Sequence, residues 1–495
     1  MVVGADTWER MKRRTFLAGS LGTLGVAAAA PALAQLSGPP PGFVRLRVAP
    51  GELTVDGKVG KAYRIEQEDG RLGWTGRRGA RFQVALDNGL AEPVAIHWHG
   101  LILPNGQDGV PYVTQPPIKP SERRLYDFPL VQAGTYWMHS HFGLQEQVMV
   151  TAPLIILDER SPQTMQDVVM MLNDFTTRDP AAILESLRAT PMAGMKMGGA
   201  MKKGMGSKPD VTDVAYDAFL ANRRSLTDPE VVRVTEGESV RLRVINMSSG
   251  SNYFVSTGQL GAQAIAVDGE DIVPLSGTRF ELGVAQRIDL RVQIPRGGGA
   301  YPILAQAEGT DGQAGIILAT AGASVSTVSP KASRLASALT NQQETRLRAL
   351  HPLARRSIDR RLRVTLGGDM MSYVWNLNGQ VWPKVTPLEV KQGERVEITF
   401  ENRTPMTHPM HLHGHVFQVT SVGGQAALGA RRDTVLVAPK QMVKVEFDAL
   451  YPGFWMIHCH LLYHQAAGMM TVLHYQGFTN QSYDPLASLA EFPRR

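Results

Sequence analysis

One ten-residue pattern occurs three times along the chain and constrains its fold more than any other feature. The copies read GARFQVALDN, GESVRLRVIN and GERVEITFEN, at residues 79–88, 237–246 and 393–402, and they align without gaps. Each begins with glycine, alternates apolar and polar side chains, and ends in asparagine. Alternation with a period of two predicts a half-buried strand, and the asparagine predicts the turn after it. The chain therefore contains three related β units.

A second element recurs after each copy. AGTYWMHSH (133–141) resembles PGFWMIHCH (452–460) when a shift of one residue is allowed, and GGGAYPILAQ (297–306) occupies the same place in the middle unit without a histidine. Short strands separated by Gly- and Pro-rich turns favour antiparallel β-sandwiches over βαβ units. We predict an all-β fold of three consecutive antiparallel β-sandwich domains, at 42–158, 164–325 and 356–478. The polar, partly helical composition of 326–355 indicates a linker.

The N-terminal residues 1–34 are predicted to be an export signal. MKRRTFLAGSLGTLGVAAAAPALAQ begins at Met11 and contains a basic start, a short apolar run and an Ala-Leu-Ala cleavage site. The pair Arg13-Arg14 is typical of the twin-arginine type. The alternative is a membrane anchor, but the run is short and rich in Gly and Ala. We expect a periplasmic mature protein.

Charge and hydropathy exclude several partners. The formal charge of +6 is mild for 495 residues, and no basic stripe with interleaved aromatic residues is present, so we expect no nucleic acid partner. No later segment is long and apolar enough to span a bilayer, so we expect no membrane partner. A single cysteine excludes an intrachain disulfide.

Most of the 13 histidines fall in four short stretches. HWHG contains His97 and His99, HSH contains His139 and His141, HPMHLHGH contains His408, His411, His413 and His415, and HCHLLYH contains His458, His460 and His464. In a strand, H-x-H directs both rings to one face, so such a pair can hold one metal or two adjacent metals. The clusters occur only in the outer units. We therefore expect a shared site between domains 1 and 3, with the middle domain as a spacer.

The single cysteine lies inside one of these clusters. Cys459 points to the opposite face from its neighbours His458 and His460, so this tripeptide can serve two metal sites at once. Cysteine, two histidines and a distant methionine are the ligands of a blue-copper electron-transfer site. This chain can supply them from Cys459, His464, His408 and Met469. Zinc also accepts Cys and His, but zinc gives no reason for the further histidines nearby.

The four stretches HWHG, HSH, HPMHLHG and HCHLLYHQAAGM resemble, in order, the copper signatures of the multicopper oxidase family, which includes laccases and bacterial copper-tolerance oxidases. The resemblance implies cupredoxin-like Greek-key domains and four copper ions. By this resemblance the type 1 ligands are His408, Cys459, His464 and Met469, and the type 2 ligands are His97 and His411. The ligands of the two type 3 ions are then His99, His139, His141, His413, His458 and His460. His351, His415 and His474 remain as structural residues.

The resemblance also implies a reaction. A reducing substrate is oxidised one electron at a time at the type 1 copper, and dioxygen is reduced to water at a trinuclear cluster. Asp108 matches the family's acidic residue near the type 2 copper, although an Asp-Gly turn is the alternative reading. Many relatives carry Glu directly after the second type 1 histidine, where this chain has Gln465. Glu146 is a candidate substitute, or else it holds a ligand histidine by a hydrogen bond.

A methionine-rich stretch of the sequence suggests Cu(I) as the electron donor. PMAGMKMGGAMKKGMG (191–206) contains Met192, Met195, Met197, Met201 and Met205. Thioethers and Cu(I) are both soft, which favours a Cu(I)-gathering loop over a loop whose methionines are inert. Further candidate Cu(I) contacts are Met406, Asp369, Met370 and Met371, for which turn or core packing is the alternative. The surrounding sequence resembles the periplasmic copper-resistance protein A branch of the family.

Three functions are therefore open. The first is a Cu(I) oxidase in copper tolerance, the second a laccase acting on phenols or aromatic amines, and the third a copper-sequestering protein without turnover. A copper nitrite reductase is a weaker alternative, because it would not need the type 3 histidines as a set. Since three sandwiches in one chain can enclose the site, we expect a monomer.

Overall fold

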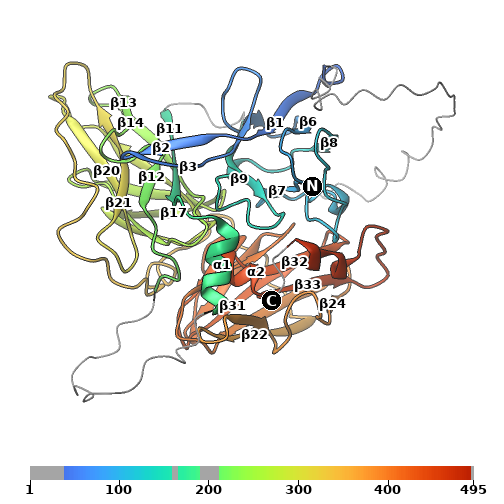
Figure 1. Ribbon diagram of the computed structural model, residues 1–495. Helices are drawn as coiled ribbons and strands as arrows, with labels where there is room; N and C mark the ends of the chain where they lie inside the picture. Colours follow the sequence, from blue (N-terminus) through green and yellow to red (C-terminus); the bar gives the residue numbers. More distant parts are fainter. Residues whose placement is uncertain (1–37, 159–164, 190–210, 492–495) are drawn as a thin grey trace, which may run out of the picture. The chain divides into compact units, whose positions relative to one another are not determined.

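The computed structural model describes residues 38–158, 165–189 and 211–491, and these are nearly all β (Figure 1). This confirms the predicted fold class. The predicted export signal (1–34) and the methionine-rich stretch (191–206) lie outside the described residues. Within the described part, the α-helices are α1 (Pro180–Ala189) and α2 (Leu462–Ala466), and the 3-10 helices η2 (Asn105–Gln107) and η3 (Pro485–Ala490). No helix there is long and apolar enough to cross a membrane.

The first sandwich consists of two four-stranded sheets. One has the order β4 (Arg64–Glu66), β1 (Val44–Ala49), β6 (Arg81–Asn88) and β8 (Arg123–Pro129). The other has the order β5 (Trp74–Arg77), β10 (Thr151–Leu157), β9 (Gly134–Ser140) and β7 (Ile96–His99). A separate hairpin joins β2 (Glu52–Val55) to β3 (Lys58–Lys61).

The second sandwich has a six-stranded and a five-stranded sheet. The larger has the order β12 (Ala218–Ala221), β11 (Gln166–Phe175), β14 (Ser239–Asn246), β19 (Arg287–Gln293), β16 (Ala262–Val267) and β17 (Glu270–Gly277). The smaller has the order β13 (Val231–Arg233), β21 (Gln313–Ala319), β20 (Ala300–Ala307), β15 (Tyr253–Ser256) and β18 (Arg279–Leu282).

The third sandwich has a seven-stranded and a five-stranded sheet. The larger has the order β23 (Val374–Leu377), β22 (Arg360–Asp369), β25 (Arg395–Asn402), β31 (Met442–Asp448), β27 (Phe417–Val422) and β28 (Gln425–Ala426), with β29 (Arg431–Arg432) also paired to β27. The smaller has the order β24 (Leu388–Val390), β33 (Met470–Tyr475), β32 (Phe454–Cys459), β26 (His408–Leu412) and β30 (Thr434–Val437).

The repeated ten-residue pattern occupies the same position in each sandwich. Its copies form β6, β14 and β25, which pair parallel with the earlier strands β1, β11 and β22, respectively, and antiparallel with a later strand. The sheets are thus not purely antiparallel: each of the six large sheets contains one parallel pair. A Greek-key connection that crosses between the two sheets produces such a pair without a βαβ unit.

The asparagine that ends each copy forms the predicted turn. The side-chain oxygen of Asn88, Asn246 or Asn402 accepts a hydrogen bond from the backbone N–H two residues later, at 2.9, 3.1 and 2.8 Å. Each side-chain nitrogen donates to backbone carbonyls further along the chain. Such local bonds are the reason that asparagine favours turns.

The apolar core shows how the sandwiches pack. One continuous cluster runs from the first sandwich into the third and includes Trp98, Trp137, Trp375 and Trp455, whereas the second sandwich has a cluster mainly of its own. Residues 326–355 form neither helix nor strand, although their composition is partly helical. They are held instead by tertiary bonds, such as that from the Leu339 backbone N–H to Glu308 (2.6 Å).

Candidate metal centre

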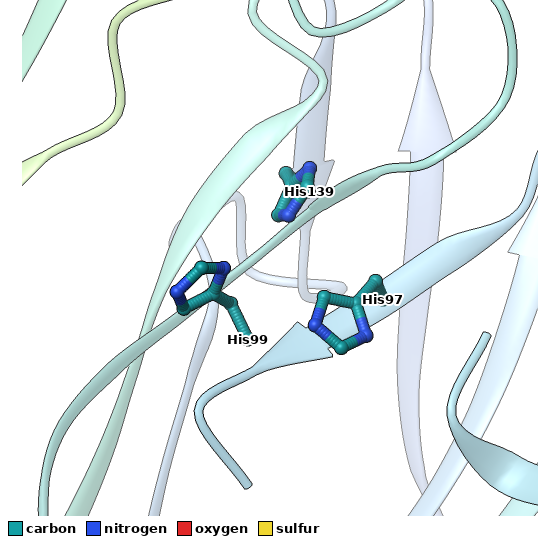
Figure 2. Close-up of side chains that lie close together, drawn as sticks. All are labelled: His97, His99 and His139. Carbon is teal, nitrogen blue, oxygen red and sulfur yellow. The ribbon is translucent and has the colours of Figure 1, made fainter. Parts of the chain in front are cut away.

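Four strands bring the histidine clusters together. In the first sandwich β7 pairs with β9, with His97 opposite His139, and Figure 2 shows these rings close to each other and to His99. In the third sandwich β26 pairs with β32, with His411 opposite His458. The local reason is the strand geometry, because two histidines separated by one residue, within a strand or at its end, direct their rings to the same face.

Rings from the two sandwiches then meet. The ring centroids of His97 and His413 are 3.8 Å apart, and those of His99 and His411 are also 3.8 Å apart. Several groups of three have candidate ligand atoms within 4.8 Å of one another, including His97, His411 and His413 in one group and His141, His413 and His458 in another. All are buried. The structure therefore brings the predicted type 2 and type 3 residues into one cluster between the first and third sandwiches.

The predicted type 1 residues form a second, adjacent group. Cys459 Sγ lies 3.5 Å from His408 Nδ1 and 3.8 Å from His464 Nδ1, and the two nitrogens are 3.2 Å apart. Met469 is fully buried, and its carbonyl accepts a hydrogen bond from the Cys459 backbone N–H (3.1 Å). The three nearest donors are thus two imidazole nitrogens and one sulfur, which form a soft ligand set.

Burial makes these imidazoles suitable metal ligands. At seven of the rings the pKa lies well below the usual histidine value. Burial is the largest cause, and repulsion from neighbouring imidazoles lowers the pKa further. These rings are His99, His139, His141, His408, His411, His413 and His460. These rings are therefore neutral at pH 7 and keep a lone pair for a metal.

Unpartnered nitrogens test whether a metal fits. Within the described residues, ring nitrogens that are buried without a hydrogen-bond partner include Nε2 of His97, His139, His141 and His411, Nδ1 of His99, and both nitrogens of His460. Buried polar atoms without a partner are costly, and native proteins rarely retain them. Metal ions at this cluster would supply the missing partner, so the residues fit a metal centre.

Three buried carboxylates fix the orientation of these rings. Asp108 accepts a hydrogen bond from His97 Nδ1 at its carbonyl (2.8 Å) and from His413 Nδ1 at Oδ2 (2.9 Å). Glu146 Oε2 lies 2.9 Å from His139 Nδ1. Hydrogen bonds of this kind hold a ligand histidine in one tautomer and direct its other nitrogen to the metal.

The third carboxylate, Asp433, is one that sequence reasoning missed. Its Oδ1 accepts from His99 Nε2 (3.1 Å), and its carbonyl accepts from His411 Nδ1 (2.8 Å). Arg287 in the second sandwich forms a two-point ion pair with it, at 2.8 and 2.6 Å. Asp433 stands in the stretch RRDT, and no local pattern distinguishes it. The second sandwich thus contributes to the site through Arg287 and is more than a spacer.

Asp213 was also missed. Its Oδ2 lies 2.8 Å from His464 Nε2 and accepts a hydrogen bond from the Tyr373 hydroxyl (2.6 Å). It lines a cavity of about 10 Å³ together with Met406 and Tyr463. The cavity lies beside the outer edge of a predicted type 1 ligand. No sequence signal points to Asp213, which lies in the plain stretch VTDV.

The candidate Cu(I) contacts have different positions. Met406 is buried beside Asp213. Asp369 is exposed and accepts hydrogen bonds from the backbone N–H groups of Met371 and Ser372 in its own turn. Met371 is 67% exposed, and Met370 packs against the core. The methionines at 192–205 lie outside the described residues.

The remaining histidines have ordinary partners or solvent. His415 Nδ1 donates to the His413 carbonyl (2.8 Å), and His415 Nε2 lies 2.6 Å from the Tyr475 hydroxyl. His474 lies 2.9 Å from Glu389, and His351 is exposed.

Comparison with known proteins agrees with this geometry. Family models described as "Multicopper oxidase" match residues 74–161, 166–325 and 356–477. The multicopper oxidase MmcO of Mycobacterium tuberculosis is 32% identical over 406 residues, which cover 80% of each chain. The chain therefore belongs to the multicopper oxidase family, whose members are oxidoreductases that use oxygen.

Other relatives represent both branches of the predicted function. Copper resistance protein A of Escherichia coli is 27% identical and covers 79% of this chain and 86% of its own. A laccase of Pycnoporus cinnabarinus is also 27% identical, and the match covers 80% of this chain and 83% of the laccase. Among solved structures, a multicopper oxidase of Pseudomonas thermotolerans has a TM-score of 0.67 at 25% identity (87% and 98% covered). The laccase of Botrytis aclada has a TM-score of 0.73 at 22% identity (90% of each chain), which supports the fold.

Proposed function

We propose that this protein oxidises Cu(I) in copper tolerance and passes the electrons to dioxygen, which is reduced to water. The observation that carries this proposal is the position of Cys459 in β32. Its sulfur lies in the group with His408 and His464, while its chain neighbours His458 and His460 lie in the larger histidine cluster. A protein that only stored copper would not need this connection.

The proposed ligands are those that the family resemblance implies, and the two groups of side chains support them. For the type 1 ion they are His408, Cys459, His464 and Met469, for the type 2 ion His97 and His411, and for the type 3 pair His99, His139, His141, His413, His458 and His460. When bound, copper supplies the one-electron chemistry and the reduction of dioxygen. The chain's own part is to set ligand geometry, conduct electrons, supply protons and limit access.

The electron path is covalent. Cys459 is joined through its backbone to both flanking histidines, and its carbonyl also accepts a hydrogen bond from His458 Nδ1 (3.0 Å). An electron received near the Cys459 sulfur therefore reaches the histidine cluster through a few bonds. His458 and Cys459 are held in place by β32, which is paired on both sides and has only buried side chains, and His460 follows directly after the strand.

Among the carboxylates, Glu146 is proposed to position a ligand. It lies 2.9 Å from His139 Nδ1 and 3.8 Å from His460 Nδ1, and it is fully enclosed. This geometry supports the hydrogen-bonding role for Glu146.

Asp108 holds His97 and His413, and its second oxygen is buried without a hydrogen-bond partner within the described chain. That oxygen lies 3.2 Å from His97 Nδ1, and this position at the cluster supports a role for Asp108 in proton supply.

The cavity beside His464 favours Cu(I) over phenols. It combines a carboxylate, Asp213, with a thioether, Met406, and its volume is about 10 Å³. Soft thioethers favour Cu(I). Pockets for drug-sized organic ligands are roughly 300–1,000 Å³, which is far larger. The copper-resistance relative supports a role in copper tolerance, and with the predicted export signal it supports a periplasmic location. A laccase activity on phenols is the second candidate, supported by the laccase relatives.

Oxygen consumption tests the proposal. The copper-loaded protein is supplied with Cu(I) or with a methoxyphenol, and we expect faster turnover with Cu(I), at one dioxygen consumed for every four Cu(I) oxidised. Met406→Leu should slow Cu(I) oxidation more than phenol oxidation, because it removes only the thioether. Glu185→Gln, an exposed change in α1, is the matched control. Faster turnover with the phenol would favour the laccase, and copper binding without oxygen consumption would favour sequestration.

A further inference from the structure

The end of the chain closes a second small cavity, beside the histidine cluster. This cavity has a volume of about 10 Å³, which is room for a single water. Its lining includes His141, Gln465, Met456, Trp382 and Glu491. It therefore connects a proposed type 3 ligand, the glutamine at the position where many relatives have a carboxyl, and a carboxyl that sequence reasoning did not consider.

The segment that carries Glu491 is fixed to the rest of the protein. The η3 residue Ser488 accepts a hydrogen bond from Trp382 Nε1 (2.9 Å). Before it, the Asp484 backbone N–H donates to the Tyr112 carbonyl (2.7 Å), and Asn480 Nδ2 donates to the Val113 carbonyl (2.9 Å). These bonds attach the segment to both the first and the third sandwich.

The two oxygens of Glu491 have different environments. Oε2 accepts a hydrogen bond from the Gly143 backbone N–H (3.1 Å), two residues after His141. Oε1 is buried and has no hydrogen-bond partner within the described chain. The residue as a whole is partly exposed. Glu491 thus extends from solvent to a cavity that has room for a water next to His141.

The surroundings of Glu491 keep it protonated. Burial raises its pKa to about 8, although the Gly143 N–H opposes this shift. The other described side chains that line the cavity are uncharged, including His141, which is neutral because burial holds its pKa well below its usual value. Tyr112 also lies nearby, and its pKa is raised by burial and, when Glu491 is ionised, by the interaction with that carboxylate. Among the described residues that line the cavity there is no lysine or arginine to hold Glu491 as a carboxylate.

We propose that Glu491 relays protons from solvent, through a water in this cavity, to the histidine cluster, in place of the carboxyl missing at Gln465. The proposal rests on the proposed function. In each cycle dioxygen takes four electrons from the substrate and four protons, and two waters form. For each proton it relays, Glu491 gives its proton to the cavity water, that water gives one onward, and Glu491 is protonated again from solvent.

The test separates electron entry from the oxygen step. Copper-loaded protein is first reduced by substrate without oxygen, and then mixed with oxygen while the blue absorption returns. Glu491→Gln keeps an acceptor for the Gly143 N–H but cannot give up a proton. We expect unchanged copper content and anaerobic reduction, and reoxidation slowed by about 10²-fold. Adding Gln465→Glu to this variant should restore part of the rate, and Glu185→Gln is the control.

The pH dependence and a copper-free measurement add independent readouts. Below pH 8 Glu491 holds its proton, so wild-type reoxidation should slow as pH rises through about 8, and Glu491→Gln should lack this step. In copper-free protein, infrared spectroscopy should detect a carboxyl that titrates near pH 8 in the wild type and in Glu185→Gln and that is lost in Glu491→Gln, whereas Glu308, whose pKa burial raises to about 7, should titrate in all three. Wild-type reoxidation rates in Glu491→Gln, or no such carboxyl, would overturn the proposal. Failure of the wild type to be reduced anaerobically by any donor would instead overturn the proposed function.

Discussion

Replacing Arg287 with methionine should destabilise the protein far more than breaking an exposed ion pair of the same length. The side chains of Arg287 and Asp433 are both fully buried, and their closest contact is 2.6 Å. Burial alone would lower the pKa of Arg287, but the carboxylates of Asp433 and Asp268 raise it, so the guanidinium stays charged. Arg287 also donates to the Thr135 carbonyl (3.0 Å), and the pair therefore links all three sandwiches.

The expected loss of stability follows from the buried carboxylate that Arg287→Met leaves without a partner. Without Arg287, Asp433 remains buried beside His99 without its counter-charge, and breaking a buried pair in this way costs about 3–5 kcal/mol. The exposed pair Arg81–Asp127 is also 2.6 Å long, but its side chains are 46% and 40% exposed. Exposed pairs contribute about 0–1 kcal/mol. Arg81→Met is therefore a control that matches in distance and differs in burial.

Thermal unfolding of the copper-free protein measures the difference without a contribution from bound metal. At about 2.1 cal/mol/K per residue, a 495-residue chain that unfolds as one unit has an unfolding entropy of about 1 kcal/mol/K. Arg287→Met should then lower Tm by about 3–5 °C, and by more if a smaller unit unfolds. Arg81→Met should lower Tm by about 1 °C or less. A shift in Arg287→Met as small as that in the control would refute the reasoning.

Three further predictions concern the site itself. Gly100→Ala should lower Tm and copper content, because Gly100 has a φ of +86° and an added Cβ would lie 2.5 Å from an Asp433 oxygen. Cys459→Ser should lose the intense blue absorption and all oxygen consumption while it keeps copper at the histidine cluster, as measured by metal analysis. Asp213→Asn should raise KM for Cu(I), because it removes the charge beside His464, and an unchanged KM would argue against Cu(I) entry there.

Most of the fold was predictable because its signals are local. The alternation in residues 79–88, 237–246 and 393–402 predicted β6, β14 and β25, and each terminal asparagine forms its turn with residues only a few positions away. The composition of 326–355 was a weaker guide. Helix propensity is small per residue, and here bonds to the neighbouring sandwiches determine the conformation instead.

The site was predictable only in part, for the same reason. H-x-H pairs are recognisable because strand geometry alone gives them a common face. Asp213, Asp433 and Glu491 carry no such signal, since each reaches its histidine through contacts between segments far apart in the sequence. A single carboxyl without a recognisable spacing to other ligands looks like a surface residue until the fold encloses it.

The location of the histidine cluster between the first and third sandwiches links metal binding to the packing of the whole chain. Without a metal, the cluster holds neutral rings at short distances and several buried nitrogens without partners, which favours separation of the two sandwiches. The apolar core shared by these sandwiches opposes that separation, as does the bridge from Arg287 through Asp433 to His99. Because only the assembled arrangement presents both sets of rings, copper binding stabilises the assembled state. A weakened bridge should therefore lower copper affinity as well as Tm, although Arg287 contacts no proposed ligand itself.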